Sequence, residues 1–200
     1  MALPSLGQRI AVARDMAFGF AYPHLLAAWR EAGAEILPFS PLADEAPDRS
    51  ADAVYLPGGY PELQAGRLAA NRRFLDGLRT AAGQGRTVSG ECGGYMVLAP
   101  GLTDAEGNRH AMAELLPVET SFAERRLHLG YRHAVLAAAM PLGAVGTVWR
   151  GHEFHYASIL SEGPGEALFE AWDAEGAPLG PMGRRAGSVF GSFFHLIDRA

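Results

Sequence analysis

The sequence predicts an α/β fold, a doubly wound and mostly parallel sheet with antiparallel additions. In the first half of the chain, short apolar segments alternate with longer segments whose apolar residues recur at helical spacing. Such alternation is typical of strand–helix–strand units, which build a parallel sheet with helices on both faces. After Pro100 the pattern changes to short strand-like segments separated by turn residues, which predicts antiparallel strands in the same domain.

The first half contains four predicted strands and two long predicted helices. The strands occupy residues 9–14, 35–39, 53–57 and 87–90. One helix covers residues 23–32, because Pro23 suits a first helical turn and Gly33 is a common helix end. The other is predicted as a single helix over residues 65–82, since its apolar residues keep helical spacing throughout.

The second half contains six strand-like segments around polar turns. They lie at residues 118–122, 127–136, 145–149, 153–160, 168–172 and 188–190. Residues 104–110 are predicted to be a polar loop. Residues 1–8 are expected to be a linker ahead of one domain that covers residues 9–200.

Composition and charge exclude several classes of function. A formal net charge of −5 argues against a nucleic-acid-binding surface. No apolar segment is long enough to span a membrane, and we expect a cytoplasmic protein. All seventeen basic residues are Arg, so the chain has no lysine for a phosphate-binding P-loop. Its single cysteine excludes an internal disulfide and a zinc site built from several cysteines.

That cysteine, Cys92, lies in the segment Gly90-Glu-Cys-Gly-Gly94, directly after a predicted strand. A short apolar segment follows and stops at Pro100. Strand, sharp turn and short helix form the layout of a nucleophile elbow, here with Cys in place of Ser. A helix N-terminus would favour the thiolate, and the Gly93 amide would point at a carbonyl under attack. The alternative is that Cys92 is a small buried apolar residue without chemistry.

Other candidate residues also follow predicted strands, at the edge where parallel sheets bind ligands. Asp15 follows the first strand and Gly58-Gly59 follows the third. The two glycines form either a simple turn or a loop whose Gly59 amide approaches a substrate oxygen. In the second case, Gly59 and Gly93 would form an oxyanion hole with two donors.

A cysteine nucleophile needs a base, and the chain offers seven histidines. His195 follows a short predicted strand between apolar neighbours, which by itself is more typical of a core histidine. His152 and His155 are three positions apart in a strand-like segment, so their side chains would point to opposite faces. We therefore predict no metal site.

Four motifs, in order along nearly the whole chain, resemble the glutamine amidotransferase domain of cobyrinic acid and hydrogenobyrinic acid a,c-diamide synthases. They are Leu56-Pro-Gly-Gly-Tyr-Pro-Glu62, Gly90-Glu-Cys-Gly-Gly-Tyr-Met96, Gly151-His-Glu-Phe-His-Tyr156 and Gly191-Ser-Phe-Phe-His195. The segment Arg14-Asp-x-Ala-Phe18 fits the same family. The resemblance implies the flavodoxin-like fold of class I, or triad-type, glutamine amidotransferases.

The resemblance also implies roles for individual residues. Cys92 would be the nucleophile, His195 the general base and acid, and the amides of Gly59 and Gly93 the oxyanion hole. Glutamine would be hydrolysed through a cysteine thioester. The ammonia would pass to a synthetase domain that amidates the a and c carboxylates of cobyrinic or hydrogenobyrinic acid. That domain, which would use ATP and Mg²⁺, is absent here and is expected N-terminal to this chain or on a partner, and this domain itself would carry no cofactor.

The chain departs from the wider triad class at one position. Those enzymes often carry His-x-Glu, whereas Ile197 stands two residues after His195. The candidates to replace the missing carboxylate are Glu91, Glu153 and Asp198. Tyr60 and His155 are candidates for the substrate pocket. Residues 152–156 would shape the glutamine pocket, the ammonia route or the contact with the synthetase.

Two other functions remain open at this stage. One is a cysteine hydrolase on a related sheet, as in the DJ-1-like proteins, which also place a cysteine on an elbow. The distant C-terminal His195 favours the amidotransferase over that class. The other is a degenerate amidotransferase-like domain that only binds a partner. Intact Cys92 and His195 argue against it, and the missing carboxylate argues for it.

Overall fold

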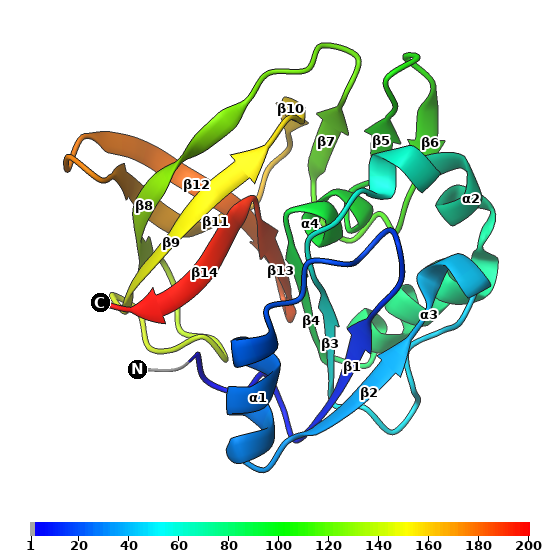
Figure 1. Cartoon of the computed structure of the whole chain (residues 1–200), viewed down its shortest axis with the longest axis horizontal. Coiled ribbons are helices and arrows are strands. Elements are labelled where there is room, and N and C mark those ends of the chain that lie inside the picture. The colour runs from blue at the N-terminus through cyan, green and yellow to red at the C-terminus, as the bar shows by residue number, and fades with distance from the viewer. Residues whose placement is uncertain (1–2) are drawn as a thin grey trace.

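The computed structural model describes residues 3–200, and its main feature is a ten-stranded mixed sheet (Figure 1). In spatial order the strands are β14 (Phe194–Arg199), β9 (Val148–His155), β8 (His128–Leu136), β11 (Glu166–Asp173), β12 (Pro178–Ala186), β13 (Val189–Ser192), β4 (Thr87–Glu91), β3 (Ala53–Leu56), β1 (Arg9–Ala13) and β2 (Glu35–Phe39). Strands β13, β4, β3, β1 and β2 are parallel to one another, and the others pair antiparallel. This confirms the predicted α/β class and its antiparallel additions.

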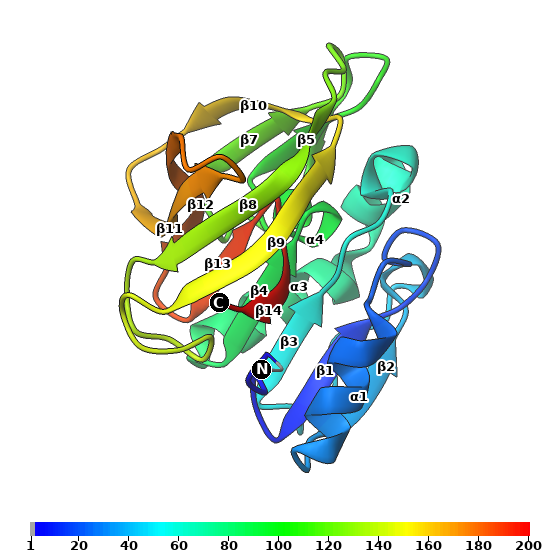
Figure 2. The same ribbon diagram turned by 60° about the vertical axis from the view of Figure 1, so that its left-hand side comes forward.

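Both faces of the parallel part are buried, as the apolar strands require. On one face, Ile10 and Val12 of β1 pack with Trp29 of α1 (Pro23–Glu31) and with residues of the antiparallel strands. On the other face, the alternate residues Ala11 and Ala13 lie in the cluster of α3 (Arg72–Gly83) and α4 (Gly93–Val97). A small second sheet, of β10 (Ser158–Glu162), β7 (Val118–Ser121), β5 (Gly101–Thr103) and β6 (Arg109–Ala111), extends the fold beyond α4 (Figure 2).

The predicted single helix over residues 65–82 is wrong. The structure has a 3₁₀ turn at Pro61–Gln64, then α2 (Ala65–Ala70), then α3. Asn71 breaks the helix with φ −82° and ψ 82°, and its side chain donates to the carbonyl oxygens of Pro41 at 2.7 Å and Leu42 at 3.3 Å. The apolar spacing continues across the break, so only the tertiary contact of Asn71 reveals it.

Several strand predictions also need correction. Residues 145–149 and 153–160 are not two separate strands, because β9 runs unbroken from Val148 to His155 and β10 follows it. Part of the predicted loop 104–110 pairs as β6. The sequence analysis missed β5, β12 and β14. Strand β12 contains two prolines and two internal glycines, and its pairing with both β11 and β13 overrides that low strand propensity.

The antiparallel part of the sheet curls back toward the parallel part. Strands β13 and β14 are separated only by Phe193, yet β13 pairs with β12 and β4 whereas β14 pairs with β9. The strands between them, β8, β9, β11 and β12, therefore bend round and return β14 to the carboxyl end of β4 (Figure 1). This curl brings the C-terminal histidine to the cysteine elbow.

The segment predicted as a linker belongs to the packed domain where the structure describes it. Leu3 and Leu6 are buried, and the indole N–H of Trp29 donates to the Pro4 carbonyl oxygen at 3.1 Å. Residues 1–2 of the predicted linker lie outside the described residues. Within residues 3–200, no helix has the length and apolar character needed to cross a membrane.

Candidate active site

Cys92 stands at a strained turn between β4 and α4, which confirms the predicted elbow geometry. Its φ of 49° and ψ of −104° are unusual for a residue with a side chain. Its backbone N–H donates to the Ser192 carbonyl oxygen at 2.8 Å, and the next turn is fixed by Gly94 N–H to Pro57 oxygen at 3.1 Å. Gly94 packs so closely on the Leu56 carbonyl that any Cβ would collide with it. The turn therefore requires glycine behind the cysteine.

His195 is hydrogen-bonded to a carboxylate that directly precedes Cys92. Its Nδ1 lies 2.8 Å from Oε1 of Glu91, and both side chains are buried, at 5% and 9% exposed. Because a carboxylate accepts, Nδ1 carries the proton and Nε2 is left to face Cys92. His195 follows β13, as the sequence predicted, and is the second residue of β14, a strand that was not predicted. Of the three candidate carboxylates, Glu91 is the one that contacts His195.

The surroundings of His195 favour its charged form. Burial lowers the pKa of His195, but hydrogen bonds to Cys92 and Glu91 and the charges of both outweigh burial and raise the pKa to about 10. These contacts favour the imidazolium form of the ring, and an imidazolium beside Cys92 would stabilise a thiolate there. Such an arrangement can supply both a nucleophile and a proton donor.

The ring of a second histidine stacks on the ring of His195, a contact that was not predicted from the sequence. His152 is the cross-strand partner of His195, and the two rings stack 5.0 Å apart at 12°. Burial, and then the charge of His195, lower the pKa of His152. Its Nε2 lies 3.3 Å from the hydroxyl of Tyr22. Burial and the nearby Glu91 and Cys92 charges raise the pKa of Tyr22 to about 12, so His195 has two uncharged neighbours.

These groups open into a cavity of about 380 Å³. Its lining includes Cys92, His195, Gly59, Tyr60, Tyr22 and His155. A methyl group built on Gly93 would lie 3.0 Å from the Gly59 nitrogen, so the two backbone segments are in contact. Neither amide has a hydrogen-bond acceptor among residues 3–200. Two free donors beside the cysteine agree with the oxyanion hole predicted from the sequence.

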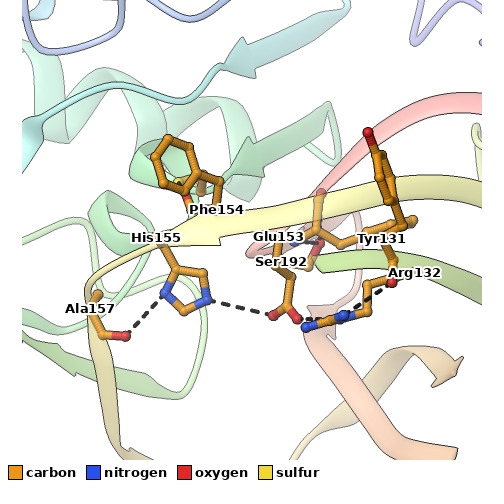
Figure 3. A network of polar contacts seen from close by, with 9 residues as sticks. Tyr131, Arg132, Glu153, Phe154, His155, Ala157 and Ser192 are labelled. Atoms are coloured by element: carbon orange, nitrogen blue, oxygen red, sulfur yellow. Dashed lines mark hydrogen bonds and ion pairs between the residues drawn. The ribbon is translucent and has the colours of Figure 1, made fainter. Parts of the chain in front are cut away.

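The other two candidate carboxylates, Glu153 and Asp198, do not contact His195. Glu153 accepts from Arg132 Nε at 2.7 Å, and its second oxygen lies 3.5 Å from Nε2 of His155 (Figure 3). Burial raises the pKa of Glu153, but these hydrogen bonds and charges outweigh it and lower the pKa. In Asp198, the buried Oδ1 has no partner within the described chain. Neither carboxylate orients His195.

His155 belongs to the wall of the cavity. Its Nδ1 donates to the Ala157 carbonyl oxygen at 3.0 Å (Figure 3), and its ring stacks on Phe193 at 3.9 Å and on His128 at 4.6 Å. The preceding carbonyl, of Phe154, lies 4.0 Å from the Cys92 sulfur. The rings of His152 and His155 stack on different neighbours, but both residues line the same cavity, so the predicted placement on opposite faces does not separate them there. No group of three potential metal ligands occurs within residues 3–200.

Asp15 follows a strand as predicted but does not line the cavity. Its two oxygens accept from the Ala17 N–H at 2.9 Å, the Ser40 hydroxyl at 2.9 Å and the Leu42 N–H at 2.8 Å. The carboxylate thereby joins the loops that follow β1 and β2. The first of these loops continues to Tyr22, which lines the cavity, so Asp15 holds in place a loop that forms part of the cavity wall.

Comparison with known proteins identifies the family. The family described as "CobB/CobQ-like glutamine amidotransferase domain" matches residues 9–199. The hydrogenobyrinate a,c-diamide synthase of Sinorhizobium sp. is 59% identical over 198 residues, which cover 99% of this chain and 45% of that protein. The synthase of the same name from Rhodobacter capsulatus is 60% identical over 98% of this chain and 44% of its own length. The chain thus spans less than half the length of these relatives.

Solved structures agree on the fold. The structure of PurLQS from Thermotoga maritima superposes with a TM-score of 0.65 at 14% identity, over 94% of this chain and 87% of that one. A crystal structure of a glutamine amidotransferase superposes with a TM-score of 0.60 at 18% identity, over 93% and 89%. The match over residues 9–199 and the identities of 59% and 60% to the two synthases show that the chain belongs to the family of CobB/CobQ-like glutamine amidotransferase domains.

Proposed function

We propose that this chain hydrolyses glutamine and supplies the ammonia with which a hydrogenobyrinate a,c-diamide synthase amidates the a and c carboxylates of its corrinoid substrate. The observation that carries the proposal is the cavity lined by Cys92, His195 and Gly59, with the Gly93 backbone packed against Gly59 and both amides without an acceptor among residues 3–200. Relatives named for hydrogenobyrinate favour that substrate over cobyrinic acid. The hypothesis of a degenerate domain that only binds a partner depended on the lack of a carboxylate beside His195, and Glu91 supplies that carboxylate.

The geometry supports the following reaction. The Cys92 thiolate attacks the side-chain amide carbon of glutamine, and the Gly59 and Gly93 N–H groups stabilise the oxyanion that forms. His195 gives its Nε2 proton to the leaving nitrogen, and ammonia departs to leave a thioester. His195 then takes a proton from water, which attacks the thioester and releases glutamate and the Cys92 thiolate. Glu91 stabilises the imidazolium and fixes its orientation throughout.

Amide synthesis requires a part that this chain lacks. The relatives are more than twice as long as the chain, and the chain contains no lysine for a P-loop. We therefore place ATP, Mg²⁺ and the corrinoid on a synthetase portion, which would be the partner of this domain. We also expect the whole enzyme to be cytoplasmic.

Covalent labelling tests the proposal. A diazo-ketone analogue of glutamine should alkylate Cys92, with the adduct located by mass spectrometry of the digested protein. Cys92→Ala, checked for folding by circular dichroism, should take up no label. A folded wild-type protein that is labelled elsewhere, or not at all in the presence of synthetase and corrinoid, would refute Cys92 as the glutamine nucleophile.

A further inference from the structure

The cavity contains one carboxylate to which the reaction above gives no task, Glu62. It is the sole acidic residue among those of residues 3–200 that line the cavity. Its Oε2 is buried and has no hydrogen-bond partner in the same part of the chain. Burial raises the pKa of Glu62, and the opposing effects of its own backbone N–H and of Arg125 are smaller. A buried acceptor without a donor is costly in the empty protein, and a ligand with a donor would relieve that cost.

The position of Glu62 relates it to the reacting groups. It lies in the 3₁₀ turn Pro61–Gln64, three residues after Gly59. That turn packs against the elbow, because a methyl group built on Gly93 would lie 2.8 Å from Cδ of Pro61. Glu62 and the two proposed oxyanion donors are therefore parts of one packed unit. A substrate bound by Glu62 would be held in a fixed position relative to Cys92.

The charge of the cavity indicates the kind of group that Glu62 would bind. Apart from Glu62 and the cysteine–histidine pair, the lining consists of aromatic, histidine and small or apolar residues. The half-exposed rings of Phe20 and Tyr60 stand edge to face at 4.9 Å on the side of the turn. A single carboxylate in such surroundings suits a compact cation with several N–H donors, since charge-assisted hydrogen bonds are strong there.

We propose that Glu62 binds the α-ammonium group of the substrate and so selects free glutamine over N-acylated or peptide-bound glutamine. The inference rests on the proposed glutaminase function and adds the group that recognises the amino-acid end of the substrate. With the amide at Cys92, the opposite end of glutamine presents a primary ammonium, which carries three donors. An N-acylated substrate has neither the charge nor those donors and leaves Glu62 unsatisfied.

The test compares two electrophiles on the folded protein. One is the diazo-ketone analogue of glutamine, and the other is the same compound acetylated on its α-nitrogen. We expect wild type to be labelled at Cys92 at least about tenfold faster by the free amine. Glu62→Gln keeps the size of the side chain and removes its charge. In this variant the ratio of the two labelling rates should fall by about 10- to 100-fold, or to one if the wild-type ratio is smaller than that. Comparing the ratio between proteins cancels the added bulk of the acetyl group.

Two controls separate recognition from damage to the site. Iodoacetamide, which carries no amino-acid end, should alkylate Cys92 in Glu62→Gln at a rate within about threefold of wild type. Glu124→Gln removes an exposed carboxylate from the loop after β7 and should leave the preference unchanged. Glu62→Asp keeps the charge and should retain more of the preference than Glu62→Gln does.

The outcomes are distinct. A Glu62→Gln protein that keeps the wild-type preference for the free amine overturns the role of Glu62 and leaves the glutaminase proposal standing. Equal labelling rates of the wild-type protein by both electrophiles would also overturn the role of Glu62 and leave the glutaminase proposal standing. A wild-type protein that, with synthetase and corrinoid present, reacts with iodoacetamide but with neither diazo-ketone refutes the glutaminase proposal, and the role of Glu62 falls with it.

Discussion

Glu91 Oε1 lies 2.8 Å from Nδ1 of His195, although 104 positions separate the two residues. The carboxylate directly precedes the nucleophile, so one backbone turn sets the positions of both Glu91 and Cys92. A His-x-Glu motif would put the carboxylate two residues after the histidine on the same strand, but here that position is Ile197 and the carboxylate comes from β4. The partner of His195 is therefore recognised by its geometry and not by its position in the chain.

Replacement of Glu91 by Gln should shift the pH dependence of turnover. The charge and hydrogen bond of Glu91 help to raise the pKa of His195 to about 10. Removing that charge lowers the pKa of His195, so the imidazolium loses its proton at a lower pH. We expect the alkaline limb of kcat/KM for glutamine to move to lower pH and the maximum to fall by about tenfold or more. An unchanged limb would contradict the role, and Glu153→Gln, which does not contact His195, is the matched control.

His195→Ala should abolish most glutaminase turnover. Acid–base assistance by a histidine contributes about 10²–10⁴-fold to a rate, and the variant loses that assistance with the fold intact. His152→Ala removes the stacked neighbour and the contact with Tyr22, and should cost less. Glutamate release and circular dichroism measured on both variants decide the assignment. Turnover near that of wild type in His195→Ala would move the role to another histidine.

Gly94→Ala should damage both the stability and the site. A Cβ at Gly94 would collide with the Leu56 carbonyl, so α4 must move off β3 and displace the elbow. We expect a lower Tm together with a loss of Cys92 labelling. Gly83→Ala is the control, since a Cβ there meets nothing within 4 Å and the residue ends α3. Its stability should stay equal or rise by about 0.5–1 kcal/mol.

Glutamine hydrolysis should depend on the synthetase portion. A free glutaminase would waste glutamine, and the loss of one oxyanion donor already costs about 10²–10³-fold in kcat. We expect the synthetase portion with ATP and hydrogenobyrinic acid to raise turnover at least about tenfold, which corresponds to about 1.4 kcal/mol of barrier. The measurement is glutamate released per unit time, with Cys92→Ala as the blank. Equal turnover with and without the synthetase would indicate a constitutive hydrolase.

Local patterns were a sound guide in the first half of the chain and a poor one in the second. The segments 35–39 and 23–32 match β2 and α1 almost residue for residue, because each carries its own period and end signals. Strand β12 and the break at Asn71 were missed, because pairing and a distant hydrogen bond determine them. Tyr22 was not predicted as a neighbour of His195, because the sequence around it reads as an ordinary loop and contains no motif.

The sequence by itself determined the elbow and the glycines that it needs, and its motifs pointed, through the family resemblance, to Cys92 and His195 as the nucleophile and base of the proposed reaction. These depend on residues adjacent in the chain or on motifs with a fixed spacing. Only the tertiary structure decided which carboxylate serves His195, because Glu91, Glu153 and Asp198 are equivalent in one dimension. The curl of the antiparallel strands returns β14 to the end of β4 and places Glu91 against the ring. The same fold places Glu153 beside Arg132, with which it forms an ion pair instead.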